Sequence, residues 1–489
     1  MCDDPPSPGP LTRRQFLLVS LAVSLSIPAV YTAAVSSVST GDRVPGPAEG
    51  SADVLYFHRS DAEYSFYRQP FNNRITLMPR VIAVCFTEQG VQEAVQLARA
   101  QSLPVAIKSG GHSLEGFSLN DDGMVIELSR LNGMRYDPAS RRFITGPGSK
   151  LGTIYGYLAA LRRLIPAGSC AGVGVAGLTL GGGYGFFSRQ FGLTCDSLLR
   201  VRLVDGRGLV QDSALNPDLL WACRGGGNGN FGIVTHLEFA THPAPSRLTS
   251  YRFRYRNLTS AKIGVLAERW FGLMQTLPTS AYSAFVLGRH GAVVVLTDTA
   301  DSPGADLKSI VAQLRIDAGK VYPPRSEELL AALKGFSGGT SPRPFKNTSA
   351  GYYSGYNDVR AFLPLVHARM QTQAGMLLQI NTLGGAIAAP DLDATAAYPH
   401  RRFSFLGELQ AYWDSPAREA AALNSVRDIQ QILHEHGIRA HYRNYPDAEL
   451  AGWQESYYGA NYARLQMLKR QFDPDNIIRH PQSVRLPEQ

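Results

Sequence analysis

The residue types best suited to binding and modifying a ligand gather in three glycine-rich stretches. The first, residues 108–113, reads Lys-Ser-Gly-Gly-His-Ser and directly follows a short apolar stretch. Adjacent glycines allow positive φ and a close backbone approach, and their N–H groups can form a nest for an anion. Lys108 adds a positive charge suited to a pyrophosphate. The alternative is a plain turn, in which His112 is a hydrogen-bonded turn histidine and not a reactive group.

The second stretch carries eight glycines between positions 168 and 185. Because few side chains remain to form a core, this segment is either flexible or wraps its backbone around a flat or anionic group. The apolar residues between the glycines favour the second interpretation. Gly172, Gly174 and Gly177 fit the pattern Gly-x-Gly-x-x-Gly, but no convincing strand precedes them, so a Rossmann site is not indicated.

A third stretch, residues 219–235, is also glycine-rich and leads into another apolar segment. Three such loops, each close to a predicted strand, indicate one extended dinucleotide lying in a groove.

The elements that must position these loops follow two patterns. From Met78 onward, short apolar runs alternate with helical periodicity, which predicts an α/β arrangement. The predicted strands here are 81–86, 105–108, 125–128, 142–146, 198–204 and 232–239, and the helices are 89–100 and 150–164. Beyond Pro243 and Pro245 the pattern predicts an antiparallel sheet backed by helices, a separate α+β domain. Its predicted strands are 252–255, 283–287, 292–296, 377–381 and 403–412, and its helices are 261–277, 307–318 and 417–434.

Composition narrows the class of protein. A chain of 489 residues suggests about two to four domains. With 44% hydrophobic and 18% charged residues, it is neither disordered nor collagenous. Lys+Arg exceed Asp+Glu by 48 − 40 = 8, but no basic run concentrates this charge, so we do not expect a nucleic-acid binder. Cys85, Cys195 and Cys223 lie among apolar residues and are predicted to be buried.

The N-terminus is typical of a bacterial export signal. Arg13 and Arg14 precede an apolar run that extends from Phe16 to about Ala34 and ends in small residues. Paired arginines before Phe-Leu resemble a twin-arginine signal, whose export machinery moves folded proteins. A membrane anchor is the alternative, although several serines and Pro28 make the run weakly hydrophobic for a span. We therefore expect a signal peptide (1–34), a linker (35–52), and a periplasmic or secreted bacterial protein.

The order of these blocks resembles the FAD-linked oxidases of the vanillyl-alcohol oxidase type, specifically the berberine bridge enzyme-like branch. The resemblance covers roughly Val54 to Val484 and includes a closing segment with Tyr442-Arg443-Asn444-Tyr445-Pro446-Asp447 and Tyr457-Tyr458-Gly459-Ala460-Asn461. It implies an α+β fold with three parts. These are a two-part PCMH-type FAD-binding domain (53–245), an antiparallel-sheet substrate domain (246–437) and a C-terminal segment (438–489) that returns to the FAD domain.

The resemblance also implies an FAD attached by two covalent bonds. In that family the histidine of Gly-Gly-His bonds to the 8α carbon of the flavin and a cysteine of the glycine-rich loop bonds to C6; His112 and Cys170 hold these positions. Ala171-Gly172 replaces the Pro-Thr that often follows the cysteine. Val173 matches a small apolar residue that leaves room for dioxygen, which favours an oxidase. The other residues expected to bind FAD are Lys108, Ser109, Gly110, Gly111, Ser113, Gly168, Gly174, Gly177, Gly181, Gly182, Gly183, Gly185, Ile233 and Asn461.

The candidate catalytic residues are Glu408, Gln410 and Tyr442. Glu408 and Gln410 alternate on a predicted strand, so both side chains lie on one face. A carboxylate desolvated beside a flavin is a candidate general base, whereas the alternative for Glu408 is a solvated strand residue. Tyr442 matches the family's active-site tyrosine, and Tyr445 in the same motif is interpreted as a packing residue.

The resemblance implies hydride transfer from a small molecule or carbohydrate to the flavin, with dioxygen reduced to hydrogen peroxide. Sugars, phenolic alcohols and alkaloid- or polyketide-like hydroxyl compounds are all candidate substrates. The alternatives are a dehydrogenase with a quinone or protein acceptor, and a non-catalytic periplasmic flavin- or ligand-binding module.

Overall fold

The computed structural model describes residues 51–339 and 341–488. The predicted signal peptide (1–34) and residues 35–50 of the predicted linker lie outside this part of the chain. Within the described ranges, no helix combines the length and apolar character needed to cross a membrane.

A four-stranded sheet places the first glycine-rich stretch at a strand end. Its order is β1–β2–β4–β3, with β2, β4 and β3 parallel and β1 antiparallel. Helix α2 (Glu88–Ala100) begins at Thr87, whose hydroxyl accepts the Gly90 N–H at 3.0 Å, and buries its apolar face against this sheet. The strands are β1 (Val54–His58), β2 (Val81–Cys85), β3 (Val105–Lys108) and β4 (Met124–Glu127).

Five antiparallel strands form a second sheet, in the order β5–β6–β10–β8–β9. The helix predicted over 150–164 is shorter, because Arg162 adopts a positive φ of 54° after α3 (Leu151–Ala159). The next two residues, β7 (Arg163–Leu164), then pair with β11 (His242–Pro243). The strands of the sheet are β5 (Met134–Asp137), β6 (Arg142–Thr145), β8 (Leu198–Val204), β9 (Val210–Asp212) and β10 (Ile233–Ala240).

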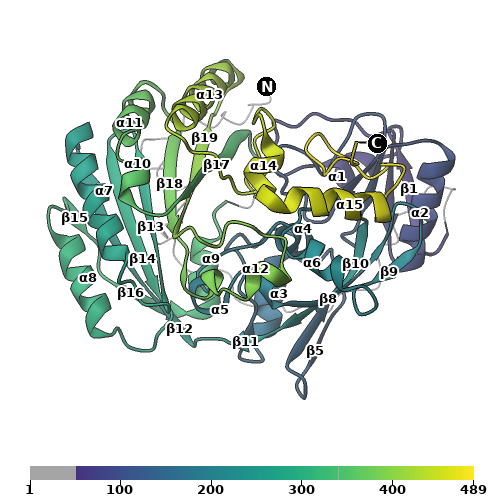
Figure 1. Cartoon of the computed structure of the whole chain (residues 1–489), viewed down its shortest axis with the longest axis horizontal. Coiled ribbons are helices and arrows are strands. Elements are labelled where there is room, and N and C mark those ends of the chain that lie inside the picture. Colours follow the sequence, from purple (N-terminus) through teal and green to yellow (C-terminus); the bar gives the residue numbers. More distant parts are fainter. Residues whose placement is uncertain (1–50, 340, 489) are drawn as a thin grey trace, which may run out of the picture.

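An eight-stranded antiparallel sheet forms the other half of the molecule, as Figure 1 shows. Its order is β15–β12–β14–β13–β18–β19–β17, with β16 also paired to β12. The strands are β12 (Arg247–Arg256), β13 (Ala281–Gly288), β14 (Gly291–Asp298), β15 (Lys320–Val321), β16 (Arg325–Glu328), β17 (Phe345–Tyr353), β18 (Met376–Thr382) and β19 (Phe405–Tyr412).

Helices cover one face of this large sheet (Figure 1). Leu409 and Ala411 of β19 share an apolar core with these helices, so the alternating residues Glu408 and Gln410 point to the opposite face. This opposite face therefore contributes polar side chains from β19. The main helices are α7 (Ser260–Met274), α8 (Ala305–Arg315), α11 (Leu363–Thr372) and α13 (Glu419–Glu435).

Short helices join these parts, and the C-terminal segment returns to the first sheet, as the fold prediction required. The Val105 N–H of β3 donates to the Ile477 carbonyl at 2.7 Å, and the Arg479 N–H donates to the Val105 carbonyl at 3.1 Å. The shorter helices are α1 (Tyr64–Arg68), α4 (Val175–Leu180), α5 (Ser188–Phe191), α6 (Pro217–Cys223), α9 (Leu329–Phe336), α10 (Tyr356–Val359), α12 (Leu392–Thr395), α14 (Trp453–Tyr458) and α15 (Tyr462–Phe472).

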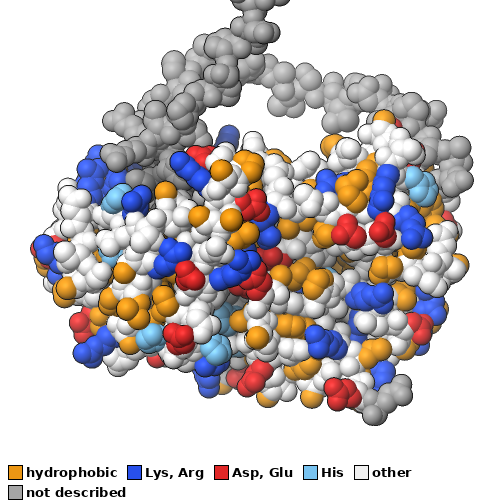
Figure 2. Space-filling view, turned by 90° about the horizontal axis from the view of Figure 1, so that it is seen from above, with side chains coloured by type: hydrophobic (Ala, Val, Ile, Leu, Met, Phe, Trp, Pro, Cys, Tyr) orange, Lys and Arg blue, Asp and Glu red, His pale blue; other side chains and the backbone are white. Residues whose placement is uncertain are grey.

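Charged side chains of both signs are interspersed over the face of the described residues seen in Figure 2. The predicted core cysteines are all free, and Cys85, Cys195 and Cys223 are buried.

Candidate active site

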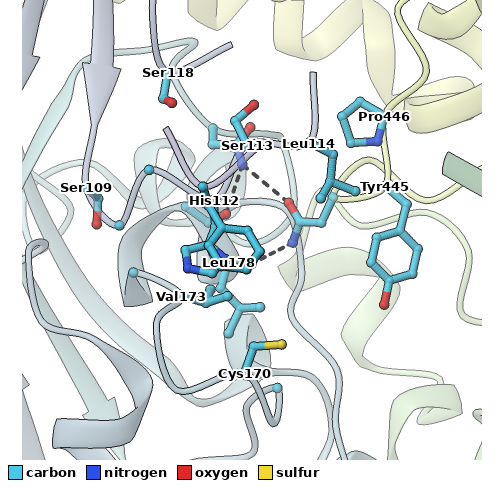
Figure 3. A pocket seen from close by; sticks show the side chains of 18 of the residues that line it. Ser109, His112, Ser113, Leu114, Ser118, Cys170, Val173, Leu178, Tyr445 and Pro446 are labelled. Atoms are coloured by element: carbon cyan, nitrogen blue, oxygen red, sulfur yellow. Dashed lines mark hydrogen bonds between the residues drawn. The ribbon is translucent and has the colours of Figure 1, made fainter. Parts of the chain in front are cut away.

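One cavity of about 410 Å³ lies between the glycine-rich loops and the face of the large sheet that carries Glu408. This volume is within the range of about 300–1,000 Å³ that is typical of ligand pockets. All three glycine-rich stretches contribute to its lining, together with β19 and the C-terminal segment. Figure 3 shows His112, Val173 and Cys170 facing this cavity, with Tyr445 across from them.

The first glycine-rich loop presents backbone N–H groups to the cavity. Residues 110–114 all line it, and within the described chain their N–H groups donate to no protein acceptor. Gly111 has a positive φ of 69°, a conformation in which successive N–H groups can converge on an anion. The buried Ser118 hydroxyl also lines the cavity without a hydrogen-bond partner among the described residues. Ser109 and Ser113 belong to the same loop and also line the cavity. This edge of the cavity therefore fits a pyrophosphate.

Lys108 has a different role from the one expected. Its ammonium lies 2.5 Å from Glu127 Oε2, and both side chains are buried. Lys108 is absent from the lining of the cavity, because it ends a strand on the inner side of the loop. Its charge is thus already neutralised inside the protein, and the backbone supplies the candidate anion site.

His112 is held by both glycine-rich loops. Its ring stacks on Phe71 with centroids 4.1 Å apart, and a Cβ on Gly172 would lie only 2.6 Å from His112 Nε2. Burial, followed by the positive charge of Lys150, lowers the pKa of His112 to about 4. The imidazole is therefore neutral at pH 7 and keeps a lone pair on one ring nitrogen.

Cys170 is exposed to the same cavity. The surrounding protein, and then the nearby carboxyl of Glu408, raise the pKa of its thiol to about 11. A proton acceptor is therefore needed before Cys170 can act as a nucleophile. The electrostatic effect also places Glu408 near the Cys170 end of the cavity.

The remaining predicted cofactor residues divide into two groups. Val173 and the glycines at 168, 174, 177 and 185 line the cavity. A Cβ on Gly181 would meet Asn444 Oδ1 at 2.0 Å, so that glycine makes room for an asparagine that itself lines the cavity.

The second group lies behind the lining. Gly182 and Gly183 have positive φ and pack against Tyr398 and Thr194 respectively. Ile233 points away from the cavity, while its neighbours Gly232 and Val234 line it. Asn461 is also outside the lining, and its Nδ2 donates to the Ala397 carbonyl at 3.1 Å. These residues support the loops instead of facing a ligand.

Glu408 and Gln410 both line the cavity, as their alternation on β19 predicts. Burial raises the pKa of Glu408 to about 7, while hydrogen bonds from Gln410, Tyr445 and Asn347 act in the opposite direction. Asn347 Nδ2 donates to Glu408 Oε1 at 3.4 Å. The alternative that Glu408 is a solvated strand residue is wrong, because Glu408 is only 7% exposed.

The two tyrosines of the C-terminal motif both line the cavity, and their hydroxyl groups have different partners. The Tyr442 hydroxyl accepts hydrogen bonds from the Gly183 N–H at 2.9 Å and from Asn444 Nδ2 at 3.1 Å, and burial raises its pKa. It therefore fixes the glycine-rich loop. The Tyr445 hydroxyl instead lies 2.7 Å from that of Tyr184 and hydrogen bonds to Glu408.

Several lining residues have no signal in the sequence, because tertiary structure alone brings them to the cavity. They come from β13, β17, β18, β19 and the loop that follows α9. Among them are Tyr282, Arg343, Asn347, Gln379 and Tyr412. For Tyr445, proximity to Tyr442 in the motif was the available signal.

The lining as a whole fits FAD. Free backbone N–H groups suit the pyrophosphate, a stretch of glycine and apolar residues suits a flat ring, and His112 and Cys170 lie where two attachments are expected. FAD would supply the acceptor of a hydride at this position.

Comparisons with known proteins identify the family and its cofactor. Residues 79–213 match the family described as FAD binding domain, and residues 441–485 match the family described as berberine and berberine like. The aclacinomycin-N/aclacinomycin-A oxidase of Streptomyces galilaeus is 32% identical, over 97% of this chain and 98% of that protein. The chitooligosaccharide oxidase of Gibberella zeae is 28% identical, over 96% and 98% respectively.

A solved structure leads to the same family. BBE-like 1 of Physcomitrella patens superposes with a TM-score of 0.82 at 25% identity, and the match covers 89% of this chain and 98% of that one. The chain thus belongs to the berberine bridge enzyme-like FAD-linked oxidases, and it is a PCMH-type, FAD-dependent oxidoreductase.

Proposed function

We propose that this chain is an exported oxidase. It takes a hydride from a hydroxyl- or amine-bearing carbon of a small molecule or carbohydrate and reduces dioxygen to hydrogen peroxide. The observation that carries the proposal is Glu408, a buried carboxyl with a pKa of about 7 on the same cavity as His112 and Cys170.

Glu408 accepts the proton of the reacting hydroxyl or amine. A pKa near 7 leaves a large deprotonated fraction at neutral pH and still gives useful basicity. Asn347 and Gln410 orient the carboxylate. The Tyr445 hydroxyl contacts both Glu408 and the Tyr184 hydroxyl, so this pair can take the proton onward.

His112 and Cys170 would hold FAD through two covalent attachments, His112 through an imidazole nitrogen and Cys170 through its sulfur. Each attachment would be a two-electron oxidation, with dioxygen as the oxidant and hydrogen peroxide as its product. Ionised Glu408 near Cys170 is the candidate acceptor of the thiol proton.

Val173 supports dioxygen as the acceptor. It is small, apolar and part of the cavity lining beside Cys170. A carbohydrate substrate is supported by the relative that oxidises chitooligosaccharides and by the side chains around Glu408. Amide groups and aromatic rings predominate there, and both are suited to neutral hydroxyl-bearing rings; they include Asn347, Gln379, Gln410, Tyr282 and Tyr412.

Export by the twin-arginine machinery is supported by the paired Arg13 and Arg14 before the apolar run. A protein that loads and attaches FAD before export keeps its cofactor in a periplasm or medium that holds no supply of it. We therefore place the mature protein in the periplasm or outside a bacterial cell.

The test is anaerobic reduction of the purified protein by a panel of oligosaccharides, sugars and phenolic alcohols, followed by mixing with air. Bleaching of the flavin and fast reoxidation, with one hydrogen peroxide per turnover, are expected for the oxidase. Slow reoxidation by air and fast reoxidation by a quinone would instead identify a dehydrogenase. Bleaching by no compound, with Glu408→Gln indistinguishable from the parent, would identify a non-catalytic flavin-binding module.

A further inference from the structure

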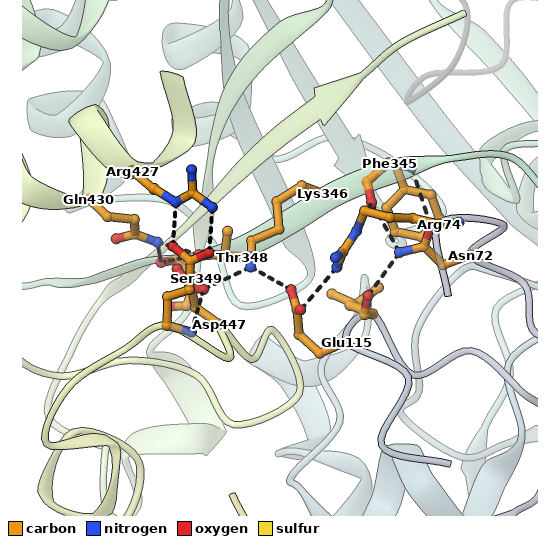
Figure 4. Close-up of polar contacts among 12 residues, drawn as sticks. Asn72, Arg74, Glu115, Phe345, Lys346, Thr348, Ser349, Arg427, Gln430 and Asp447 are labelled. Carbon is orange, nitrogen blue, oxygen red and sulfur yellow. Dashed lines mark hydrogen bonds and ion pairs between the residues drawn. The ribbon is translucent and has the colours of Figure 1, made fainter. Parts of the chain in front are cut away.

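A buried chain of alternating charges lies beside the cavity, outside the groups already assigned (Figure 4). Lys346 Nζ lies 2.7 Å from Glu115 Oε1 and 2.8 Å from Asp447 Oδ1, and the three side chains are 6%, 4% and 9% exposed. Arg74 adds a pair with Glu115 Oε2 at 2.9 Å. The four charges sum to zero, so each buried ion has an opposite partner.

Each member of this cluster belongs to a different part of the chain. Glu115 follows His112 by three residues, Lys346 lies on β17, and Asp447 follows Tyr445 by two residues. Along the sequence, Lys346 is 231 residues from Glu115 and 101 residues from Asp447. One ammonium group thus makes ion pairs that join three segments of the chain.

Further hydrogen bonds make the same junction. The Asn72 side chain is fully buried, and its Nδ2 donates to the Leu114 carbonyl at 2.9 Å and to the Phe345 carbonyl at 3.0 Å. Its neighbour Phe71 stacks on His112. On the other side, Asn347 follows Lys346 directly and donates to Glu408.

From this arrangement we infer that Lys346 is a positioning residue: it holds the loop of His112 in register with the proton-accepting groups Glu408 and Tyr445. Buried ion pairs contribute little net stability compared with apolar packing, but they can specify one arrangement of the segments that they join. The inference rests on the proposed function, because it concerns the alignment of the attached ring with the base. A misplacement of about 1 Å at such a site can slow the chemical step by about 100-fold.

The experiment compares four variants of the holoenzyme with the parent. Lys346→Met removes the charge and leaves Asp447 without its ammonium partner, so it also lowers the melting temperature. The double variant Lys346→Met/Asp447→Asn leaves only the paired Glu115 and Arg74, and so separates stability from alignment. Lys346→Arg keeps the charge. The control is Arg427→Met, which breaks the exposed pair with Glu449 near the same segment.

Two rate constants are measured by stopped flow. For Lys346→Met and the double variant, reduction by saturating substrate is expected to slow by about 10- to 100-fold. Reoxidation by air after dithionite reduction should stay within about twofold, because dioxygen does not need alignment with Glu408. Lys346→Arg should recover part of the reduction rate, and Arg427→Met should match the parent. A double variant that regains both the melting temperature and the parent reduction rate would overturn the inference.

A second readout does not depend on the substrate. In a Cys170→Ala background, His112 makes the only attachment to the flavin. In that background, Lys346→Met should reduce the acid-stable flavin to less than half of the background value. Arg427→Met should leave it unchanged. An unchanged acid-stable fraction contradicts the inference. If the parent itself is reduced by no compound, the proposed function fails, and this attachment readout alone decides whether Lys346 positions the loop.

Discussion

Among single residues, Glu408 is the proposed proton acceptor. It lines the cavity together with Gln410, and their shared face was predictable because alternation along a strand is a local property of the sequence. The size of the rise in its pKa could not be predicted from sequence, because the rise comes from burial by residues distant in the chain.

Replacing Glu408 with Gln should slow substrate-driven flavin reduction by about 100- to 10,000-fold, the usual contribution of a positioned general base. In the parent enzyme the deprotonated form is active, so the reduction rate should rise with pH through about 7 and then level off. Stopped-flow reduction across pH 5–9 measures both effects. A parent profile without this rising limb, or a Gln variant that keeps it, contradicts the role of Glu408.

The same residue should lower stability at alkaline pH. The folded pKa of about 7 lies above the ordinary value of 4.5, so the folded state favours the protonated carboxyl, and its stability falls as pH rises between these values. Above pH 7, Glu408→Gln should therefore be more stable than the parent by up to about 3 kcal/mol. At pH 4 the two should unfold alike. Urea unfolding at pH 4 and pH 8 measures the difference, and equal stability at both pH values contradicts the burial effect.

Tyr442 and Tyr445 show what a motif can and cannot indicate. The motif located both near the flavin, but only tertiary contacts reveal that the Tyr445 hydroxyl contacts Glu408 while the Tyr442 hydroxyl accepts the Gly183 N–H. We expect Tyr445→Phe to slow flavin reduction by about 10-fold or more, since it removes a group in the proton path. Tyr442→Phe should instead mainly lower the melting temperature. Paired stopped-flow and thermal measurements decide, and the opposite ranking would refute this assignment.

At the scale of elements, the predicted strands and helices follow apolar periodicity closely, whereas others were not predicted, among them β1, α11 and α15. Strand β17 was not predicted because its nine residues are all buried and include Lys346, Asn347, Thr348 and Ser349, so no alternation marks it. Lys108 was assigned to a pyrophosphate because the sequence shows a strand end followed by Gly-Gly. The sequence does not show that Glu127 on β4 is its ion-pair partner.

The second glycine-rich stretch folds tightly because its glycines approach other backbone atoms. A Cβ on Gly185 would lie 2.0 Å from the Ala167 carbonyl oxygen, so Gly185→Ala should lower the free energy of unfolding by about 1–3 kcal/mol. The control is Gly272→Ala in α7, where no heavy atom lies within 4 Å of the added Cβ and a gain of about 0.5–1 kcal/mol is expected. Urea unfolding of both variants tests this. An unchanged free energy of unfolding for Gly185→Ala would show that the loop can shift to make room for the added methyl group.

At the scale of the whole molecule, the site exists only where three parts meet. The loops of the two smaller sheets supply the anion cradle and the attachment residues, the large sheet supplies Glu408, and the C-terminal segment supplies Tyr445. The resemblance predicted this architecture, including the return of the C-terminal segment beside β3. The contacts that lock the three parts, such as Lys346 with Glu115 and Asp447, could not be predicted from sequence because each joins distant segments.

We propose that two side chains from two glycine-rich loops, His112 and Cys170, attach one FAD. Proteolysis of the acid-precipitated protein, followed by mass spectrometry, tests this attachment. We predict one flavin-containing species in which the peptide of His112 and the peptide of Cys170 are joined through the cofactor, with each single alanine variant keeping one attachment. Release of all flavin into the acid supernatant, or a flavin attached to neither peptide, would contradict the claim.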